Sequence, residues 1–280
     1  VTNNGQSVQS IQLINPITEK ILHTVTIPTS WYGLQFSTNE KFLYASGGND
    51  NWILRYPILN NKMNKPDTFF LGKKWPNRIS PTGIALDEAN HKMYVVTKDD
   101  NSLYIFNIQT KAIINKIALG AEAYTCVLSP DHKQLYISLW GGDKLVTVNT
   151  TTLAQTSLPV GDNPNEICLS KSGRFLYVAN ANDNSVSVID TKKNAVIETL
   201  NAALYPDAVV GSTSNGVALS EDEKQLYIAN ADNNCLAVFD VKIPGASKSA
   251  GYIPTGWFPT NVKVIGKKIF VTNGKGLSSM

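Results

Sequence analysis

One carboxylate stands among amide side chains at corresponding points of a repeated pattern. Two aligned residues lead into each of six short apolar segments, and Glu166 is the only ionisable residue among them. Other aligned positions carry Asn165, Asn215, Asn261 and Thr82. Carboxylate and amide oxygens bind Ca²⁺, so these residues could form a calcium site. Because a single carboxylate binds Ca²⁺ weakly, we favour the alternative, a channel mouth filled by water and amide hydrogen bonds.

The histidines and cysteines do not supply a catalytic set. His91 and His132 fall in turns that the repeat places on the opposite face from Glu166, and His23 falls in an outer strand, so no histidine is available there as a base. A Ser/His/Asp arrangement would need partners that the repeat holds apart. The three cysteines lie in apolar strands without metal-ligand spacing, which predicts small buried core residues: Cys126, Cys168 and Cys235.

The tryptophans gather on the face that carries Glu166. The repeat places all five in or beside the loops of that face, and three further aromatic residues lie nearby. An aromatic-rich rim suits a ring-stacking ligand, a sugar or a partner protein. The alternative is that each ring wedges between neighbouring repeats and stays buried. The predicted ligand-binding residues are Trp31, Tyr32, Trp52, Trp75, Tyr124, Trp140, Trp257 and Phe258.

These residues are positioned by a repeat that covers the chain. A basic residue followed within a few positions by an apolar residue and an aromatic recurs six times, and successive aromatics lie between 41 residues (Tyr136 to Tyr177) and 50 residues (Tyr44 to Tyr94) apart. A period near 40 to 45 residues with several short strands in each copy is typical of β-propeller blades. The sequence therefore predicts an all-β propeller.

The fifth copy shows the plan of one blade. Its strands are expected at Glu166–Ser170, Phe175–Ala179, Ser185–Ile189 and Ala195–Leu200, separated by turn-forming residues. Four antiparallel strands in about 40 residues make one propeller blade. The hairpin Asn180–Asn184 between the second and third strands is rich in turn formers. Turn formation accounts for its Asn and Asp residues, so they need no catalytic or binding role.

Seven blades in one domain are predicted, and six remain possible. Second strands number seven, whereas first, third and fourth strands number six each. The first copy lacks a first strand and the last copy stops after its second. We therefore expect incomplete outer blades and a segment of a longer chain. The predicted blades are 1–30, 31–72, 79–120, 123–161, 163–202, 213–256 and 258–280.

Several segments resemble the YVTN β-propeller repeat, as found in YncE-like proteins: Leu176–Asn180, Leu226–Asn230, Ile269–Asn273 and Ser185–Asp190. Val1–Gln6 and Thr272–Leu277 also resemble bacterial secreted proteins in which such a propeller precedes an alkaline-phosphatase-type phosphoesterase domain. This resemblance implies a periplasmic or extracellular location and a possible covalently linked phosphoesterase domain beyond Met280.

Composition excludes some classes of partner. A net charge of +3 without clustered Lys and Arg is too small for a nucleic-acid footprint. The segment contains neither a signal peptide nor a membrane span. With 42% hydrophobic and only 17% charged residues, the chain has enough apolar side chains for a packed interior.

From the residues we predict a non-catalytic propeller that binds a small molecule or protein through its Trp-rich face and needs no cofactor. The reason is that no catalytic constellation accompanies the aromatic face. The alternative is a lactonase-like hydrolase that uses Glu166 and the neighbouring asparagines around Ca²⁺. Lactonase-type propellers usually carry more charged groups at the channel mouth than the aligned positions show here.

Overall fold

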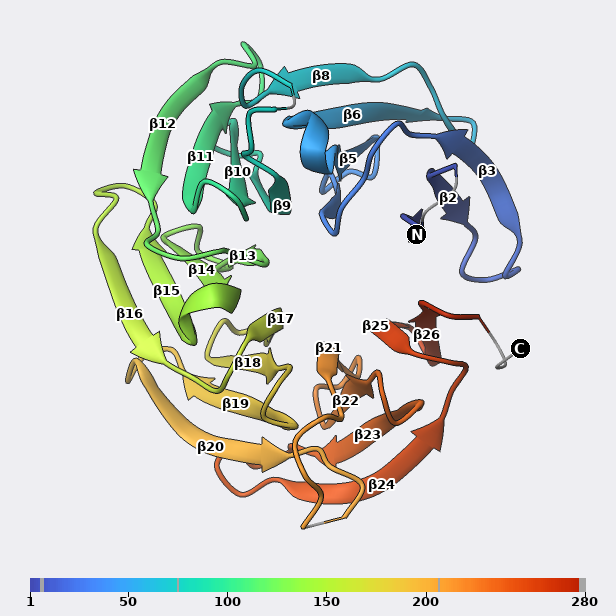
Figure 1. The fold of residues 1–280 in the computed structure, drawn as a ribbon, viewed down its shortest axis with the longest axis vertical. Helices are drawn as coiled ribbons and strands as arrows, with labels where there is room; N and C mark the ends of the chain where they lie inside the picture. The colour runs from blue at the N-terminus through green and yellow to red at the C-terminus, as the bar shows by residue number, and fades with distance from the viewer. Residues whose placement is uncertain (6–7, 75, 206, 277–280) are drawn as a thin grey trace. The chain divides into compact units, whose positions relative to one another are not determined.

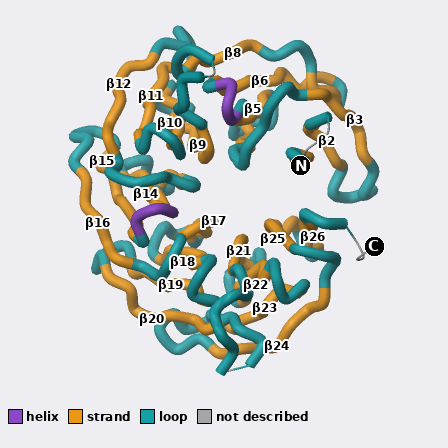
Figure 2. The backbone as a smooth tube through the Cα atoms, viewed as in Figure 1, coloured by secondary structure: helices purple, strands orange, loops and turns teal. Residues whose placement is uncertain are grey.

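The computed structural model describes residues 1–280 apart from 6–7, 75, 206 and 277–280. Short β-strands make up most of its regular structure (Figures 1 and 2). The two helical segments among the described residues are three-residue 3₁₀ turns, η1 (Gly48–Asp50) and η2 (Trp140–Gly142). The chain divides into two compact units, Val1–Leu128 (unit 1) and Ser129–Met280 (unit 2). None of the helical segments that the structure describes is long and apolar enough to cross a membrane.

Unit 1 contains thirteen strands in the part described. They are β1 (Thr2–Asn3), β2 (Ser10–Ile14), β3 (Ile21–Thr26), β4 (Leu34–Phe36), β5 (Phe42–Ser46), β6 (Trp52–Leu59), β7 (Lys62–Met63), β8 (Asp67–Phe70), β9 (Pro81–Asp87), β10 (Lys92–Thr97), β11 (Ser102–Asn107), β12 (Ile113–Ala118) and β13 (Cys126–Leu128). Strands β1 to β3 form one antiparallel sheet, β4 to β8 a second and β9 to β12 a third.

Unit 2 continues the same pattern. Its strands are β14 (Gln134–Leu139), β15 (Lys144–Asn149), β16 (Gln155–Pro159), β17 (Pro164–Leu169), β18 (Phe175–Asn180), β19 (Ser185–Asp190), β20 (Ala195–Asn201), β21 (Ser214–Leu219), β22 (Gln225–Asn230), β23 (Cys235–Asp240), β24 (Lys248–Pro254), β25 (Pro259–Ile265) and β26 (Lys268–Asn273). Strands β17 to β20 and β21 to β24 form four-stranded sheets in chain order, and β25 pairs with β26.

The observed strands confirm the predicted propeller blade. In the sheet β17 to β20 each strand pairs antiparallel with the next, and all four lie within two residues of the predicted segments. The predicted incomplete outer blades are also present, since among the described residues the first sheet has three strands and the last has two. The fold class predicted from the sequence, an all-β array of four-stranded antiparallel blades, is therefore correct.

Side chains from neighbouring sheets fill the interior of unit 2. Tyr177 on β18 and Val188 on β19 pack in one cluster with Leu226, Ile228 and Phe239 of the following sheet. Successive strand residues point to opposite faces, and both faces of these central strands are buried. This packing fixes where each strand begins, and hence where the residues that lead into it lie.

An Asx residue with left-handed backbone ends the hairpin loop before five third strands. The φ angles of these residues lie between 50° and 58°, a region that Asn and Asp tolerate better than other side chains. Four of their side chains bind the chain segment that leads into the next sheet. The five residues are Asn51, Asn101, Asp143, Asn184 and Asn234.

In unit 2 these side chains hold the approaches to β21 and β25. Asn184 Oδ1 accepts hydrogen bonds from the backbone N–H groups of Gly211 (2.9 Å) and Ser212 (2.6 Å), just before β21. Asn234 Oδ1 accepts one from the N–H of Phe258 (2.8 Å), just before β25. A hairpin residue of one sheet therefore fixes the position of the next inner strand.

An ion-pair cluster joins two sheets of unit 1. Arg55 on β6 donates two hydrogen bonds to Asp67 on β8, and the Lys111 ammonium lies 2.7 Å from the same carboxylate. Burial alone would raise the pKa of the Asp67 carboxyl, but hydrogen bonds from Arg55 and Lys111 hold it below its ordinary value of 3.8. The ionised carboxylate is therefore the form that stabilises the fold.

We expect Asp67→Asn to lower the Tm by about 2–4 °C at neutral pH, through weaker charge-assisted hydrogen bonds at a partly exposed site. A carboxyl group whose pKa is lower in the folded than in the unfolded protein stabilises the fold at pH values above its unfolded pKa. This stabilisation is lost as the pH falls through the pKa of the folded state. The Tm difference from wild type should therefore shrink below pH 3.8. Scanning calorimetry from pH 7 to pH 2 measures this, with the exposed Asp207→Asn as control. A difference independent of pH would contradict the charge argument.

Candidate functional site

Three inner strands of unit 2 bring polar side chains from distant parts of the sequence together. Strands β17, β21 and β25 lie side by side (Figure 1). Asn165 on β17 donates a hydrogen bond from Nδ2 to Oδ1 of Asn215 on β21, at 2.8 Å. An added Cβ on Gly216 would lie 2.9 Å from Cα of Asn261, so glycine permits the close approach of β21 and β25.

Glu166 lies at the centre of this group. Its Oε1 is 3.2 Å from Nζ of Lys263, and its Oε2 accepts a 3.4 Å hydrogen bond from Nδ2 of Asn261. Both partners come from β25, where residues two apart point to the same face. We call Asn165, Glu166, Asn215, Asn261 and Lys263 the Glu166 cluster.

The sequence predicted four members of this cluster and missed Lys263. Asn165, Glu166, Asn215 and Asn261 were aligned as residues that lead into inner strands, and the structure brings these four together. Lys263 is two positions further along β25, inside the strand, and was not considered. The alternation of side chains along a strand was the available signal, since it places Lys263 on the face of Asn261.

The two charged groups of the cluster differ in exposure. The Glu166 side chain is 9% exposed, whereas that of Lys263 is 62% exposed. The Glu166 carboxylate raises the pKa of the Lys263 ammonium, and burial opposes this only in part. Lys263 is therefore a cation at neutral pH, and most of its side chain is exposed.

Asn165 contributes an unused acceptor. The residue is only 3% exposed, and within the described structure its Oδ1 has no hydrogen-bond partner. Ser138 on β14 donates a 2.7 Å hydrogen bond to the Asn165 carbonyl, which fixes the backbone of β17 at this point. A buried acceptor without a partner favours a donor from a bound water or ligand.

The cluster does not fit Ca²⁺. A Lys263 ammonium 3.2 Å from Oε1 already neutralises the only carboxylate of the cluster, and a second cation there would be repelled. Across the described ranges, no group of three or more His, Cys, Asp or Glu residues could hold a metal ion. The calcium-binding alternative for Glu166, Asn165, Asn215 and Asn261 therefore has no support in this geometry.

The aligned residues of unit 1 have structural roles. The Thr82 hydroxyl is buried within 3.1 Å of the Val96 carbonyl and 3.0 Å of the Ala123 carbonyl. An added Cβ on Gly33 would collide with the Thr82 carbonyl oxygen at a separation of 1.9 Å. Thr82 thus joins β9 to β10 and to the segment that leads into β13.

The predicted aromatic residues of unit 1 are mostly covered. Trp52 is 5% exposed and packs in the core with Ile11 and Tyr56, so its ring is not available to a ligand. Tyr32 and Tyr124 are half-buried against each other, with ring centroids 4.5 Å apart. Trp31 is also half-buried, and the Lys98 ammonium lies 5.1 Å from its ring centroid. Trp75 lies outside the described residues.

The aromatic residues of unit 2 are more accessible. Trp140 in η2 is 38% exposed. Trp257 and Phe258 are half-buried on the segment before β25, and the Lys275 ammonium lies 4.5 Å from the Phe258 ring centroid. These three residues remain predicted ligand contacts.

The cysteines occupy apolar surroundings, as predicted. Cys126 and Cys235 are buried and Cys168 is half-buried, and none forms a disulfide. Burial raises the pKa of all three thiols, to about 11 for Cys168. None is therefore a reactive thiolate at neutral pH.

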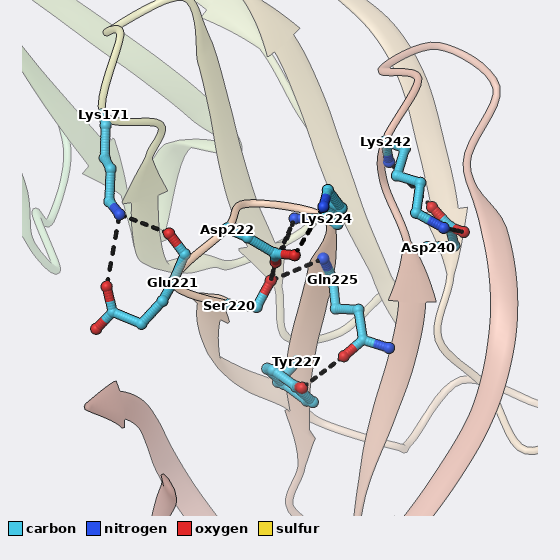
Figure 3. A network of polar contacts seen from close by, with 9 residues as sticks. All are labelled: Lys171, Ser220, Glu221, Asp222, Lys224, Gln225, Tyr227, Asp240 and Lys242. Atoms are coloured by element: carbon cyan, nitrogen blue, oxygen red, sulfur yellow. Dashed lines mark hydrogen bonds and ion pairs between the residues drawn. The ribbon is translucent and has the colours of Figure 1, made fainter. Parts of the chain in front are cut away.

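A different part of unit 2 carries a surface hollow lined by Ser220, Glu221, Asp222, Tyr227, Val264, Gly266, Lys267 and Ile269. Figure 3 shows the polar network of its turn, in which Lys171 lies 3.5 Å from the Glu221 carboxylate. Both side chains of this pair are more than half exposed, so the ion pair contributes little to the stability of the fold. The hollow includes no member of the Glu166 cluster.

The family model described as "Lactonase, 7-bladed beta-propeller" matches residues 118–275. The chain belongs to this lactonase family. The matched stretch is more than half of the 280 residues and contains every member of the Glu166 cluster. The family is seven-bladed, which agrees with the blade number favoured from the sequence.

Several solved structures share this fold. A protein from Lactobacillus plantarum is 19% identical with a TM-score of 0.78 and covers 97% of this chain and 87% of its own. A putative 6-phosphogluconolactonase from Bacteroides fragilis is 20% identical with a TM-score of 0.74, over 96% and 85%. Hydrazine synthase from Kuenenia stuttgartiensis is 15% identical with a TM-score of 0.78, over 94% and 86%. These likenesses show the fold alone. No curated protein matches the chain.

The family corrects the functional prediction made from the sequence. A non-catalytic binding or scaffolding module was predicted, because no catalytic constellation accompanied the aromatic face. Membership of the lactonase family overturns that prediction and supports the hydrolase alternative. The sequence analysis compared only the residues leading into each inner strand and did not consider Lys263 inside β25.

Proposed function

We propose that this protein hydrolyses a lactone at the Glu166 cluster, without a metal ion. The observation that carries the proposal is the Glu166–Lys263 pair, which lies in the stretch that matches the lactonase family. It combines a carboxylate that can accept a proton with an ammonium that can face a developing negative charge.

Glu166 is the proposed general base. Water adds to the lactone carbonyl carbon and gives a proton to the carboxylate, which forms a tetrahedral intermediate. The ring C–O bond then breaks, and the protonated carboxyl returns the proton to the ring oxygen that leaves. The product is a hydroxy acid. The Asn261 amide donates a hydrogen bond to Oε2 of Glu166. Oε1, which contacts Lys263, is then the oxygen that accepts the proton from water.

Lys263 is the residue proposed to stabilise the negative charge that develops on the substrate. The carbonyl oxygen becomes negative in the tetrahedral intermediate, and a fixed ammonium stabilises that charge more than it stabilises the neutral ester. The raised pKa of Lys263 keeps it protonated at the pH of the reaction. When Glu166 accepts the proton from water it becomes neutral, and the 62% exposed Lys263 side chain can then turn its ammonium toward the substrate oxygen.

Hydrolysis of glucono-1,5-lactone by the purified protein tests the proposal. Acid release is followed in a pH-stat near pH 6.5, with a blank for spontaneous hydrolysis. We expect catalysis above the blank, at an undiminished rate in the presence of EDTA. A rate equal to the blank for this and other simple lactones would contradict the function. Loss of the rate on chelation would contradict the metal-free mechanism.

Three further features belong to the proposal. The YVTN-type repeat, the exported location and a linked phosphoesterase domain stay predictions from the sequence resemblance. Cell fractionation with an antibody to the protein tests the location, and recovery in the cytoplasmic fraction would contradict export. Trp140, Trp257 and Phe258 stay the predicted ring contacts of the substrate.

A further inference from the structure

One position of the inner strand can be compared among four sheets. It is the residue that follows the first paired residue of the strand. The strand pairing is irregular at this point in all four sheets, and such a bulge can redirect a side chain. The equivalent residues are Thr82 on β9, Asn165 on β17, Asn215 on β21 and Thr260 on β25.

The two threonines have a structural role that the two asparagines do not share. The hydroxyl groups of Thr82 and Thr260 each donate a hydrogen bond, at 3.1 Å, to a carbonyl on the second strand of their own sheet. Asn165 instead donates from Nδ2 to Oδ1 of Asn215, in the next sheet along the chain. The asparagines therefore depart from the role that this position has in the other two sheets.

The hydrogen bond between the asparagines fixes the orientation of the Asn215 amide. Because Oδ1 of Asn215 is the acceptor, its Nδ2 group points away from Asn165 with both N–H donors unused. Among the described residues, Asn165 is the hydrogen-bond partner of this side chain. Asn165 itself is 3% exposed and leaves its Oδ1 without a partner in the described structure, which is unfavourable for stability and hence favours a functional role.

Asn215 lies between the two charged groups of the Glu166 cluster. Its strand, β21, is flanked by β17, which carries Glu166, and by β25, which carries Lys263 (Figure 1). Along β21 (Ser214–Leu219), Asn215 has the one polar side chain that is not buried. A substrate that contacts both Glu166 and Lys263 therefore lies beside β21, where Asn215 offers a side-chain donor.

We propose that Nδ2 of Asn215 donates a hydrogen bond to the carbonyl oxygen of the lactone, together with the Lys263 ammonium, and that Asn165 positions this donor. The inference rests on the proposed function and adds a catalytic residue and a positioning residue to it. A fixed N–H donor stabilises the negative oxygen of the tetrahedral intermediate more than the neutral ester. Because Asn165 orients the amide before substrate binds, little reorganisation is needed during the reaction.

Substitution of Asn215 tests the donor, with glucono-1,5-lactone as substrate. Asn215→Leu keeps the size of the side chain and removes the donor, so we expect kcat to fall by about 10²-fold with a smaller change in KM. Asn215→Asp still accepts the hydrogen bond from Asn165 but, when ionised, has no donor, so it should lose at least as much. Asn233→Leu is the matched control, because Asn233 is also half-buried, lies in the hairpin of the same sheet and donates one hydrogen bond, to Ser212 at 2.7 Å. Its kcat should be unchanged.

Asn165→Ala tests the positioning role. This substitution releases the Asn215 amide, and we expect kcat to fall by about tenfold through misplacement of the donor. In an Asn215→Leu background the same substitution should lower kcat by less than about twofold, because the donor that it positions has gone. An equal loss in both backgrounds would show that Asn165 acts on the fold and does not position Asn215.

Thermal unfolding of each variant separates a loss of chemistry from a loss of fold. If Asn215→Leu fails to fold, Asn215→Asp decides, since it keeps the hydrogen bond with Asn165. Wild-type kcat in a folded Asn215 variant, or a change in KM alone, would overturn the inference and leave the proposed function standing. Absence of hydrolysis above the blank by the wild-type protein would overturn the function, and the inference with it.

Discussion

Glu166→Gln is expected to lower kcat/KM for lactone hydrolysis by about 10²–10⁴-fold, the range for loss of a general base. Gln keeps the size of the side chain, and its single carbonyl oxygen can accept a hydrogen bond from Lys263 in place of Oε1. It cannot accept a proton from water. The loss should therefore appear in kcat, with a smaller change in KM, because the proton transfer takes place in the transition state.

Glu221→Gln is the matched control. Glu221 is also a glutamate beside a lysine in unit 2, with its carboxylate 3.5 Å from Lys171, but it lies in the turn shown in Figure 3 and outside the Glu166 cluster. Activity should be unchanged in this variant. Thermal unfolding of both variants separates a loss of chemistry from a loss of fold. Full activity in a folded Glu166→Gln would exclude Glu166 as the base.

Asn51→Ala is expected to have the largest effect on stability. The Asn51 side chain is fully buried and makes four hydrogen bonds, two to the carbonyls of Lys73 and Asn77 and two from the N–H groups of Ile79 and Ser80. Each contributes about 1 kcal/mol, and the backbone groups left buried without partners add to the cost. We expect a loss of about 3–5 kcal/mol in the free energy of unfolding.

Asn101→Ala separates these hydrogen bonds from the backbone conformation. Asn101 occupies the corresponding hairpin position with a similar φ of 50°, compared with 58° for Asn51. Its Oδ1 has no hydrogen-bond partner among the residues described. Both variants place alanine in the left-handed region, at a cost of about 1–2 kcal/mol. Urea unfolding should show Asn51→Ala to be the less stable by about 2–4 kcal/mol, whereas equal midpoints and slopes would show that its four bonds contribute nothing.

The blade architecture could be predicted because its contacts are local in sequence. Each strand of the sheet β17 to β20 pairs with the next along the chain, through turns that Gly, Asn and Asp favour. Alternating apolar residues and turn formers therefore located β18 (Phe175–Asn180) and β19 (Ser185–Asp190) to within one residue. The same alternation could not say which aromatic residues would be covered. Trp52 lies in the core because it begins β6 and packs with Ile11 of β2 and with Tyr56 further along its own strand.

The sequence by itself determined the fold class, the repeat and four of the five residues of the Glu166 cluster, since these depend on patterns shorter than one blade. Only the tertiary structure decided how the charges are arranged. Glu166 and Lys263 are 97 residues apart, and they meet because β25 lies beside β21, which lies beside β17. An electrostatic interaction depends on distance in space, and that distance is set by the packing of whole blades. The strand pattern could single out Glu166, but the ion pair that it forms with Lys263 became visible only in the structure.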